Sequence, residues 1–257
     1  EAELKAIDQA TAKLPILREL PEGQRRVTKI HNRGSFLDQG EVVEGGVLDS
    51  IAPWPKDAPR NRLGVARWLT SPDNPLTPRV LANRAWARIF GIGLVETEED
   101  FGSQGAPPSH PALLDWLAAH YRDDLKWSLK SLIKTIVMSA TYQQAYRLDA
   151  VRRERDPRDI WLSRASRYRL SAEQVRDQAL AVAGLLSAKM GGPPVMPPQP
   201  AGLWKSTYST ARWVTSTGED RYRRGLYTYW KRTTPYPSMV TFDAGSREVC
   251  LVRRITT

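Results

Sequence analysis

The chain has 257 residues, of which 41% are apolar and nine are tryptophan, and its formal net charge is +10. That apolar content excludes an intrinsically disordered chain, because enough apolar surface can be buried to offset the entropy of ordering. No apolar run approaches the roughly 20 residues of a membrane-spanning helix, so no membrane span is expected. The only cysteine, Cys250, excludes an internal disulfide and a cysteine-rich metal site. The three histidines are widely scattered, so no metal site is expected.

Residues 1–59 are expected to form an N-terminal helix followed by an extended arm or linker. Apolar side chains spaced by three or four residues predict the helix over 1–14. Residues 27–31 can form one strand, and glycines and prolines interrupt the rest of 15–59. Residues 60–257 are then expected to be the main, helical domain.

Two helices with clear start and stop signals are predicted early in the main domain. The first covers 63–69 and precedes a proline-rich turn. The second covers about 78–90, where Thr77 is predicted to cap the helix and Pro78 to occupy its first position. Gly91 is predicted to end this helix, because glycine adopts a left-handed conformation at little cost.

An acidic loop over 94–108 is predicted to follow. Ser109 is then predicted to cap a third helix. Its core face is marked by apolar side chains at helical spacing, namely Leu113, Leu114, Leu117 and Tyr121. A fourth helix is predicted over about 128–143.

The remaining third of the chain gives weaker signals. The sequence Ser171-Ala-Glu-Gln174 is a capping box and predicts a helix that runs to about residue 186. Residues 190–202 contain five prolines and three glycines and are expected to be a loop. Residues 204–230 are compatible with a short hairpin, and 219–231 equally with a helix. The predicted fold class is a mainly α, irregular helical domain with a minor β element and long Pro/Gly-rich loops.

Most of the positive charge lies in two stretches. Residues 147–176 carry nine basic and five acidic side chains, and residues 204–232 carry seven basic and two acidic ones. A concentrated positive field favours anionic partners such as phosphate groups, sulfated or carboxylated glycans, or an acidic protein face. A well-solvated, arginine-rich surface without a ligand explains the same charge equally well.

Several ordered segments together resemble one known family. They are Asn61-Arg-Leu-Gly-Val-Ala-Arg-Trp-Leu, Asn83-Arg-Ala-Trp, Phe90-Gly-Ile-Gly-Leu-Val, Asp100-Phe-Gly-Ser-Gln-Gly, His110-Pro-Ala-Leu-Leu-Asp-Trp, Trp127-Ser-Leu-Lys-Ser-Leu, Met138-Ser-Ala-Thr-Tyr-Gln-Gln, Gly191-Gly-Pro-Pro-Val and Phe242-Asp-Ala-Gly-Ser-Arg-Glu-Val-Cys. The chain resembles, over about residues 35–254, the planctomycete cytochrome c-associated C-terminal domain, which is a domain of unknown function.

The resemblance implies a cellular location and a domain context, but no activity. It implies an exported protein of the periplasm or cell envelope, whose haem c is carried by a separate cytochrome c-type domain of the same protein. This chain is then expected to hold no cofactor of its own. Relatives usually continue beyond residues 252–254, so the domain is expected to be truncated at its C-terminal end. The resemblance supplies no established catalytic residues.

The turn that ends the chain offers one candidate site. Asp243, Arg247, Glu248 and Cys250 lie within eight residues, and a turn lining a cleft can use Arg247 to bind a carboxylate or sulfate. Asp243 or Glu248 can then transfer a proton, with His110 as a further catalytic candidate at a helix start. The alternatives are an internal salt bridge with Cys250 as a small buried apolar residue, and ordinary helix capping by His110.

Aromatic and cationic side chains offer a second candidate, a ligand-binding surface. Its predicted members are Arg84, Trp213, Tyr222, Tyr227, Trp230 and Cys250. The rings can stack on sugar rings or bases, although core packing is expected to use about half of them. Arg84 can also pair with the acidic residues 96–100, which is the alternative that we favour.

The leading hypothesis is an accessory domain that recognises an anionic or carbohydrate ligand and assists redox processing by the cytochrome c-type domain. Three alternatives remain. The first is a hydrolase or lyase that uses Asp243, Arg247 and Glu248 with His110, so enzymatic activity is left open. The second is a structural assembly module. The third is a nucleic-acid-binding protein, which is disfavoured because no recognition motif accompanies the charge.

Overall fold

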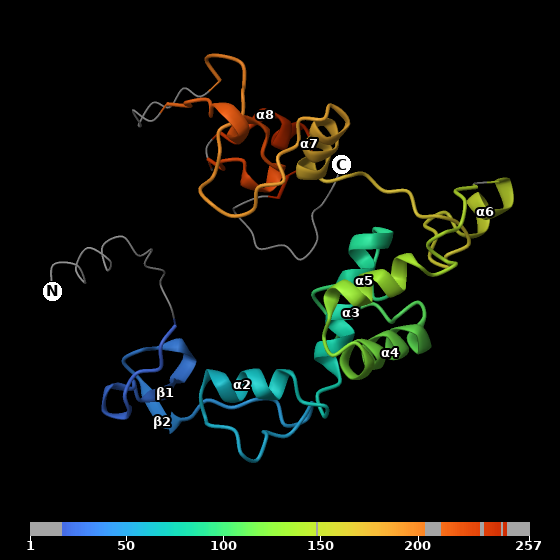
Figure 1. The fold of residues 1–257 in the computed structure, drawn as a ribbon. Coiled ribbons are helices and arrows are strands. Elements are labelled where there is room, and N and C mark those ends of the chain that lie inside the picture. The colour runs from blue at the N-terminus through green and yellow to red at the C-terminus, as the bar shows by residue number, and fades with distance from the viewer. Residues whose placement is uncertain (1–16, 148, 204–211, 232–233, 243, 246–257) are drawn as a thin grey trace. The chain divides into compact units, whose positions relative to one another are not determined.

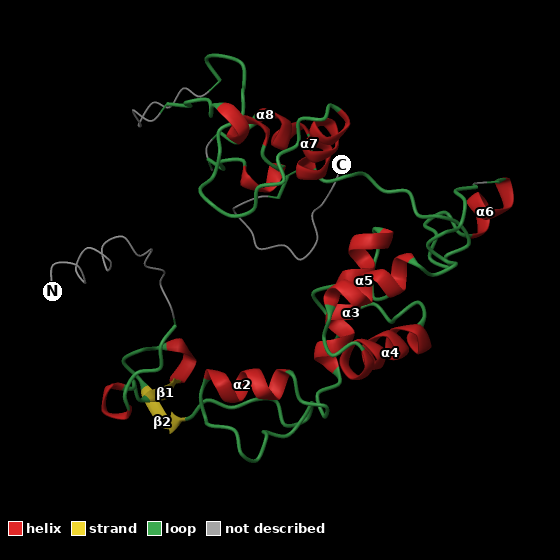
Figure 2. Ribbon diagram, viewed as in Figure 1, coloured by secondary structure: helices red, strands yellow, loops and turns green. Residues whose placement is uncertain are grey.

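The computed structural model describes residues 17–147, 149–203, 212–231, 234–242 and 244–245 (Figure 1). Helices dominate these residues, and their only sheet has two strands (Figure 2). The predicted fold class, mainly helical with a minor β element, is therefore confirmed. The helix predicted over 1–14 lies outside the described residues. The chain divides into two compact units, Glu1–Pro78 and Arg79–Thr257.

The first unit contains a β-hairpin. Strand β1 (Thr28–His31) pairs antiparallel with β2 (Gln39–Val43), which confirms the strand predicted at 27–31. A short 3-10 turn, η2 (Asn32–Gly34), follows β1, and both Arg33 and Gly34 have positive φ angles there. A second 3-10 turn, η1 (Glu22–Gln24), precedes the hairpin.

Helix α2 (Arg62–Leu69) completes the first unit and confirms the prediction at 63–69. The Asn61 side chain opens the helix by accepting hydrogen bonds from the backbone N–H groups of its first turn. A Cβ atom at Gly64 would lie 2.1 Å from the Pro59 oxygen and 2.4 Å from the Trp54 ring. Gly64 is therefore required because the helix backbone packs directly on the preceding segment.

The second unit has a core built by three helices. They are α3 (Leu76–Phe90), which crosses the boundary between the units, α4 (Pro111–Ala119) and α5 (Leu129–Val137). A π-helical turn, η3 (His120–Asp124), extends α4. The buried cluster consists of Ala82, Ala85, Trp86, Phe90, Leu94, Val95, Leu114, Leu117, Tyr121, Leu132 and Ile136. Of the apolar face predicted for the third helix, Leu114, Leu117 and Tyr121 belong to this cluster and Leu113 packs against it, because the helix buries one face.

Two predicted caps are wrong. Helix α3 is opened by Asn74, which is 1% exposed and whose Oδ1 accepts hydrogen bonds from Leu76 N and Thr77 N at 3.0 and 3.2 Å. Thr77 therefore lies inside the first turn. The backbone N–H and hydroxyl of Ser109 both donate to the Leu94 oxygen, and α4 starts one residue later than predicted.

Two helix boundaries also differ from prediction, and one helix was not predicted. Helix α5 ends at Val137 instead of about 143, because Ser139 donates to the Ile136 oxygen and turns the chain. Helix α7 (Ala172–Val182) has the predicted capping box but stops early, where Gly184 takes a φ of +68°. Helix α6 (Ala150–Arg155) was not predicted, because its sequence is mostly charged and has no apolar period.

The last part of the second unit is held by short elements. Two 3-10 turns, η4 (Gly218–Tyr222) and η5 (Gly225–Tyr227), precede the short helix α8 (Pro237–Thr241). Isolated parallel bridges join Ser187 to Arg223 and Val195 to Thr228. Within 212–231, neither the hairpin nor the long helix that the sequence allowed is present. Residues 190–202 form the predicted loop. Among the described residues no helix is long and apolar enough to span a membrane.

Candidate functional site

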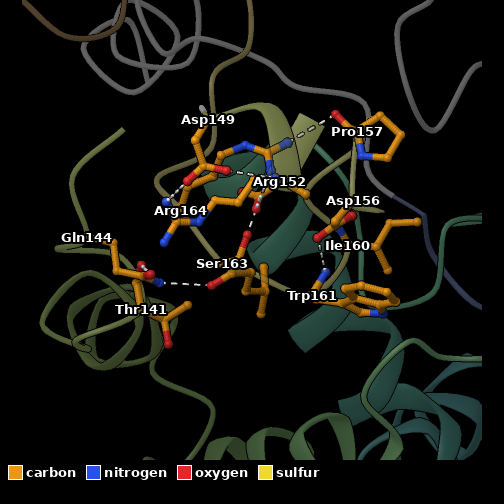
Figure 3. A network of polar contacts seen from close by, with 12 residues as sticks. Thr141, Gln144, Asp149, Arg152, Asp156, Pro157, Ile160, Trp161, Ser163 and Arg164 are labelled. Atoms are coloured by element: carbon orange, nitrogen blue, oxygen red, sulfur yellow. Dashed lines mark hydrogen bonds and ion pairs between the residues drawn. The ribbon is translucent and has the colours of Figure 1, made fainter. Parts of the chain in front are cut away.

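A polar network organises the segment that follows α5 (Figure 3). Asp156 is buried, and its two carboxylate oxygens accept hydrogen bonds from Ile160 N at 2.8 Å and Trp161 N at 2.9 Å. Gln144 donates to the Leu162 oxygen at 2.9 Å. Asp149 caps α6 and pairs with Arg152 at 2.7 Å. Side chains, rather than a regular ladder, therefore satisfy much of this loop's backbone.

Asp159 and Arg164 form a buried ion pair at the centre of this segment. Arg164 Nη1 lies 3.6 Å from Asp159 Oδ1, and the two side chains are only 6% and 9% exposed. Asp159 Oδ1 also accepts from Ser163 N, and Arg164 Nη2 donates to the Pro157 oxygen. Burial raises the pKa of the Asp159 carboxyl, and the nearby Arg164 opposes that rise.

The same pair borders a cavity of about 390 Å³. Among its lining residues are three arginines and three aromatic residues, namely Arg158, Arg164, Arg167, Phe90, Tyr146 and Tyr168. We call this the arginine cavity. Asp159 is the acidic side chain that lines it, so positive charge predominates on its walls.

Local contacts fix the walls of the arginine cavity. The Arg167 guanidinium lies over the Tyr146 ring at 5.5 Å from its centroid. The Tyr168 hydroxyl donates to the Arg88 oxygen at 3.3 Å. Gly91, at the C-terminal end of α3, has a φ of +81°, and a Cβ atom there would lie 3.0 Å from Tyr168 Cβ. The end of α3 therefore supplies the surface on which Tyr168 packs.

The acidic loop forms an ion pair with one residue that lines this cavity. Glu96 pairs with Arg158. Arg84 is exposed and has no hydrogen bond or ion pair among the residues that the structure describes. The favoured pairing of Arg84 with residues 96–100 is therefore wrong, because the partner of Glu96 comes from the arginine-rich segment instead. No three His, Cys, Asp or Glu side chains of the described residues are grouped as metal ligands would be.

Only His110 of the predicted catalytic set belongs to the described residues. Asp243, Arg247, Glu248 and Cys250 all lie outside the residues described. His110 occupies the N-cap position of α4 but makes no side-chain cap, and its Nδ1 lies 3.0 Å from Ser109 Oγ. Its convergence with the C-terminal turn stays a prediction.

The predicted aromatic residues lie in the last part of the second unit and are partly buried. Trp213 Nε1 donates to the Pro197 oxygen at 2.8 Å, and its ring stacks on Tyr236 at 5.8 Å. The Tyr227 hydroxyl accepts from Gly191 N at 2.7 Å. Tyr222 and Trp230 are half-buried. Two of these aromatic residues thus hold the proline-rich loop in place, which is the packing role that the sequence left open.

Sequence reasoning missed two groups of residues. The first is Arg223, which is 1% exposed, lies over the Tyr227 ring at 3.8 Å and donates to the oxygens of Lys189, Gly191 and Pro193. The second is the lining of the arginine cavity. The excess of basic residues in 147–176 was the available signal for it, but charge alone does not locate a cavity.

Comparison with known proteins gives one match. A family model, PSD1, described as a protein of unknown function (DUF1553), matches residues 61–257. No curated protein and no solved structure shows significant similarity to the chain. The matched span includes every residue that lines the arginine cavity.

Proposed function

Since the protein belongs to the PSD1 family of unknown function (DUF1553), which supplies no activity, we propose from the geometry that it is a ligand-recognition domain for an anionic ligand. The arginine cavity is the observation that carries this proposal. Its volume of about 390 Å³ is within the range of small-molecule sites. Three guanidinium groups and one carboxylate on its walls favour a negatively charged occupant.

Arg167 is the residue best placed to bind the anion. It is exposed and lies over the Tyr146 ring, and its N–H groups are not used by another protein group among the described residues. A guanidinium group presents two parallel donors that match a carboxylate, sulfate or phosphate. Arg158, in contrast, already pairs with Glu96.

The tyrosines suit a ligand that also has a flat or apolar face. Tyr146 is 44% exposed and Tyr168 is 46% exposed, and both line the cavity. An aromatic ring exposed in this way can stack on a sugar ring or another planar group. An acidic carbohydrate or a phosphorylated metabolite combines the two features.

The wider setting of this domain is part of the same proposal. The motifs that resemble cytochrome c-associated domains support an accessory role in an exported, periplasmic or cell-envelope protein. Haem c would then belong to a separate domain of the full-length protein, and the bound ligand would be presented to it for redox processing. This chain would contribute the binding site and no cofactor.

Isothermal titration calorimetry of the full chain at an ionic strength of about 0.15 M, where charges more than about 8 Å apart are largely screened, tests the binding proposal. The ligands are inorganic phosphate, sulfate and a uronate oligosaccharide. Arg167→Ala is expected to weaken binding by roughly tenfold or more, because a hydrogen bond to a charged group contributes about 1.5–3 kcal/mol. The matched control is Arg153→Ala, which removes the same charge from an exposed position on α6 outside the cavity.

The control variant is expected to keep the affinity of the wild type within about a factor of two. Equal losses in the two variants would mean that net charge, and not the cavity, attracts the anion. Absence of binding for all three ligands would refute the proposed function.

A further inference from the structure

Two atoms beside the arginine cavity have no hydrogen-bond partner among the described residues. They are Asp159 Oδ2, an acceptor, and Arg164 Nη1, a donor. Both belong to side chains that line the cavity and are more than nine-tenths buried. The 3.6 Å between Nη1 and Oδ1 is too long for a hydrogen bond. Buried polar groups in native proteins are nearly always satisfied, so this acceptor and donor require an explanation.

A single ligand group can satisfy both atoms if it carries an acceptor oxygen next to an O–H donor. Hydrogen phosphate has this pattern: one oxygen accepts from Arg164, and the P–O–H group donates to Asp159. Sulfate has no proton at neutral pH, so its oxygens would face the lone pairs of the Asp159 carboxylate, which can only accept. We infer that, given the proposed anion binding, Asp159 and Arg164 make the arginine cavity select a protonated phosphate group over sulfate.

The orientation of the Asp159 carboxylate is fixed by local hydrogen bonds, so it is expected to stay in place when sulfate approaches. Its backbone has a φ of +55°, an unusual conformation for a residue other than glycine. Its Oδ1 accepts from Ser163 N at 3.1 Å. The neighbouring Asp156 fixes the next two backbone N–H groups, those of Ile160 and Trp161.

The phosphate must displace a neighbouring side chain to reach these shielded atoms. Arg167 and Tyr146 are the exposed lining residues without a hydrogen bond among the described residues, and they contact each other. Moving this pair breaks only a cation–π contact. Such a contact is weak at an exposed position.

The charged groups around Asp159 set the pH at which this selection works. Arg164 and Asp156 act on its carboxyl, and Arg158 and Arg167 are the other charged side chains that line the cavity. Burial raises the pKa of Asp159. Once protonated, the carboxyl can donate to sulfate as well, so the preference is expected to decline as the pH falls.

The test compares dissociation constants of inorganic phosphate and sulfate at neutral pH for the wild type, Asp159→Asn and Asp149→Asn. The wild type is expected to prefer phosphate by about tenfold or more, which corresponds to one additional satisfied hydrogen bond. Asp159→Asn is expected to bring the ratio near one, because the amide can donate to sulfate. Asp149→Asn makes the same charge change in the same segment, outside the cavity, and is expected to keep the wild-type ratio.

The outcomes separate this inference from the proposed function. If the wild type binds neither phosphate nor sulfate, the selection by Asp159 is overturned, and the proposed function is refuted only if the uronate oligosaccharide also fails to bind. Equal affinities in the wild type, or an unchanged preference in Asp159→Asn, leave anion binding intact and overturn the selection by Asp159. The wild-type comparison needs no variant, so it remains decisive even if Asp159→Asn does not fold. Phenyl phosphate, compared with inorganic phosphate at mildly acidic pH, identifies whether a monoester or the free ion is bound more tightly.

Discussion

Asn83 is expected to be the single polar side chain on which the fold of α3 and its following loop most depends. It is fully buried, its Oδ1 accepts from Val95 N at 2.9 Å, and its Nδ2 donates to the Val95 oxygen at 2.9 Å. Gly93 allows this approach, because a Cβ atom there would lie 2.7 Å from Asn83 Nδ2. Asn83→Ala would leave both polar backbone groups of the buried Val95 without partners.

The cost of Asn83→Ala follows from those two groups. Each unsatisfied buried group costs about 1–3 kcal/mol, and substitutions above about 5 kcal/mol are exceptional, so a loss of about 3–4 kcal/mol is expected. For a chain of this size that corresponds to a fall in Tm of about 10 °C. Urea unfolding followed by circular dichroism and by tryptophan fluorescence measures it.

Arg84→Ala is the control, since Arg84 is the next residue on α3, is exposed and has no partner among the described residues. Its effect is expected to stay within about 0.5 kcal/mol. If Asn83→Ala costs less than about 1 kcal/mol, water or a rearranged loop satisfies Val95. The predicted dependence of the fold on the two Asn83–Val95 hydrogen bonds would then be refuted.

Two further predictions concern the arginine cavity. Gly91→Ala is expected to destabilise by more than Gly184→Ala in thermal melts. Both glycines have positive φ angles. At Gly91 the new Cβ would meet Tyr168, whereas nothing lies within 4 Å at Gly184. Equal losses of stability in the two variants would show that Tyr168 moves aside at no cost. Because burial raises the pKa of Asp159, its contribution to stability is full below about pH 4 and declines as the pH rises through the folded pKa. Asp159→Asn should therefore gain stability relative to the wild type as the pH rises above about 4, and a relative gain as the pH falls would contradict this prediction.

The sequence predicted the parts of the fold in which apolar side chains repeat at a helical period. Helices α3 to α5 and their shared core follow from that period because burial of one face stabilises each of them. Caps were less predictable. Asn74 and Thr77 are both good capping residues within four positions, and only the path of the turn decides which of them reaches the free N–H groups.

The arginine cavity could not be predicted, for a different physical reason. Most of its walls come from residues 146–168, where the backbone is fixed by carboxylates such as Asp156 and by left-handed residues such as Asp159 and Leu162. Leu162 is not a residue that favours the left-handed region, so no turn signal marks it. The network forms only when side chains distant in sequence meet their backbone partners, as Gln144 does at Leu162.

The residues of the recognisable motifs and most of the residues that line the arginine cavity lie in different parts of the sequence. Asn83 and Gly64, both within motifs that resemble the family, are used for packing and for satisfying buried backbone. The cavity takes Phe90 and Gly91 from one such motif, but its arginines and tyrosines all come from a stretch without one. The motifs therefore accompany the helical core, whereas the ligand that we propose for the cavity would depend on residues that the motifs do not include. A relative with the same motifs but without arginine at positions 158, 164 and 167 is expected to share the helical core and to lack the preference for anions.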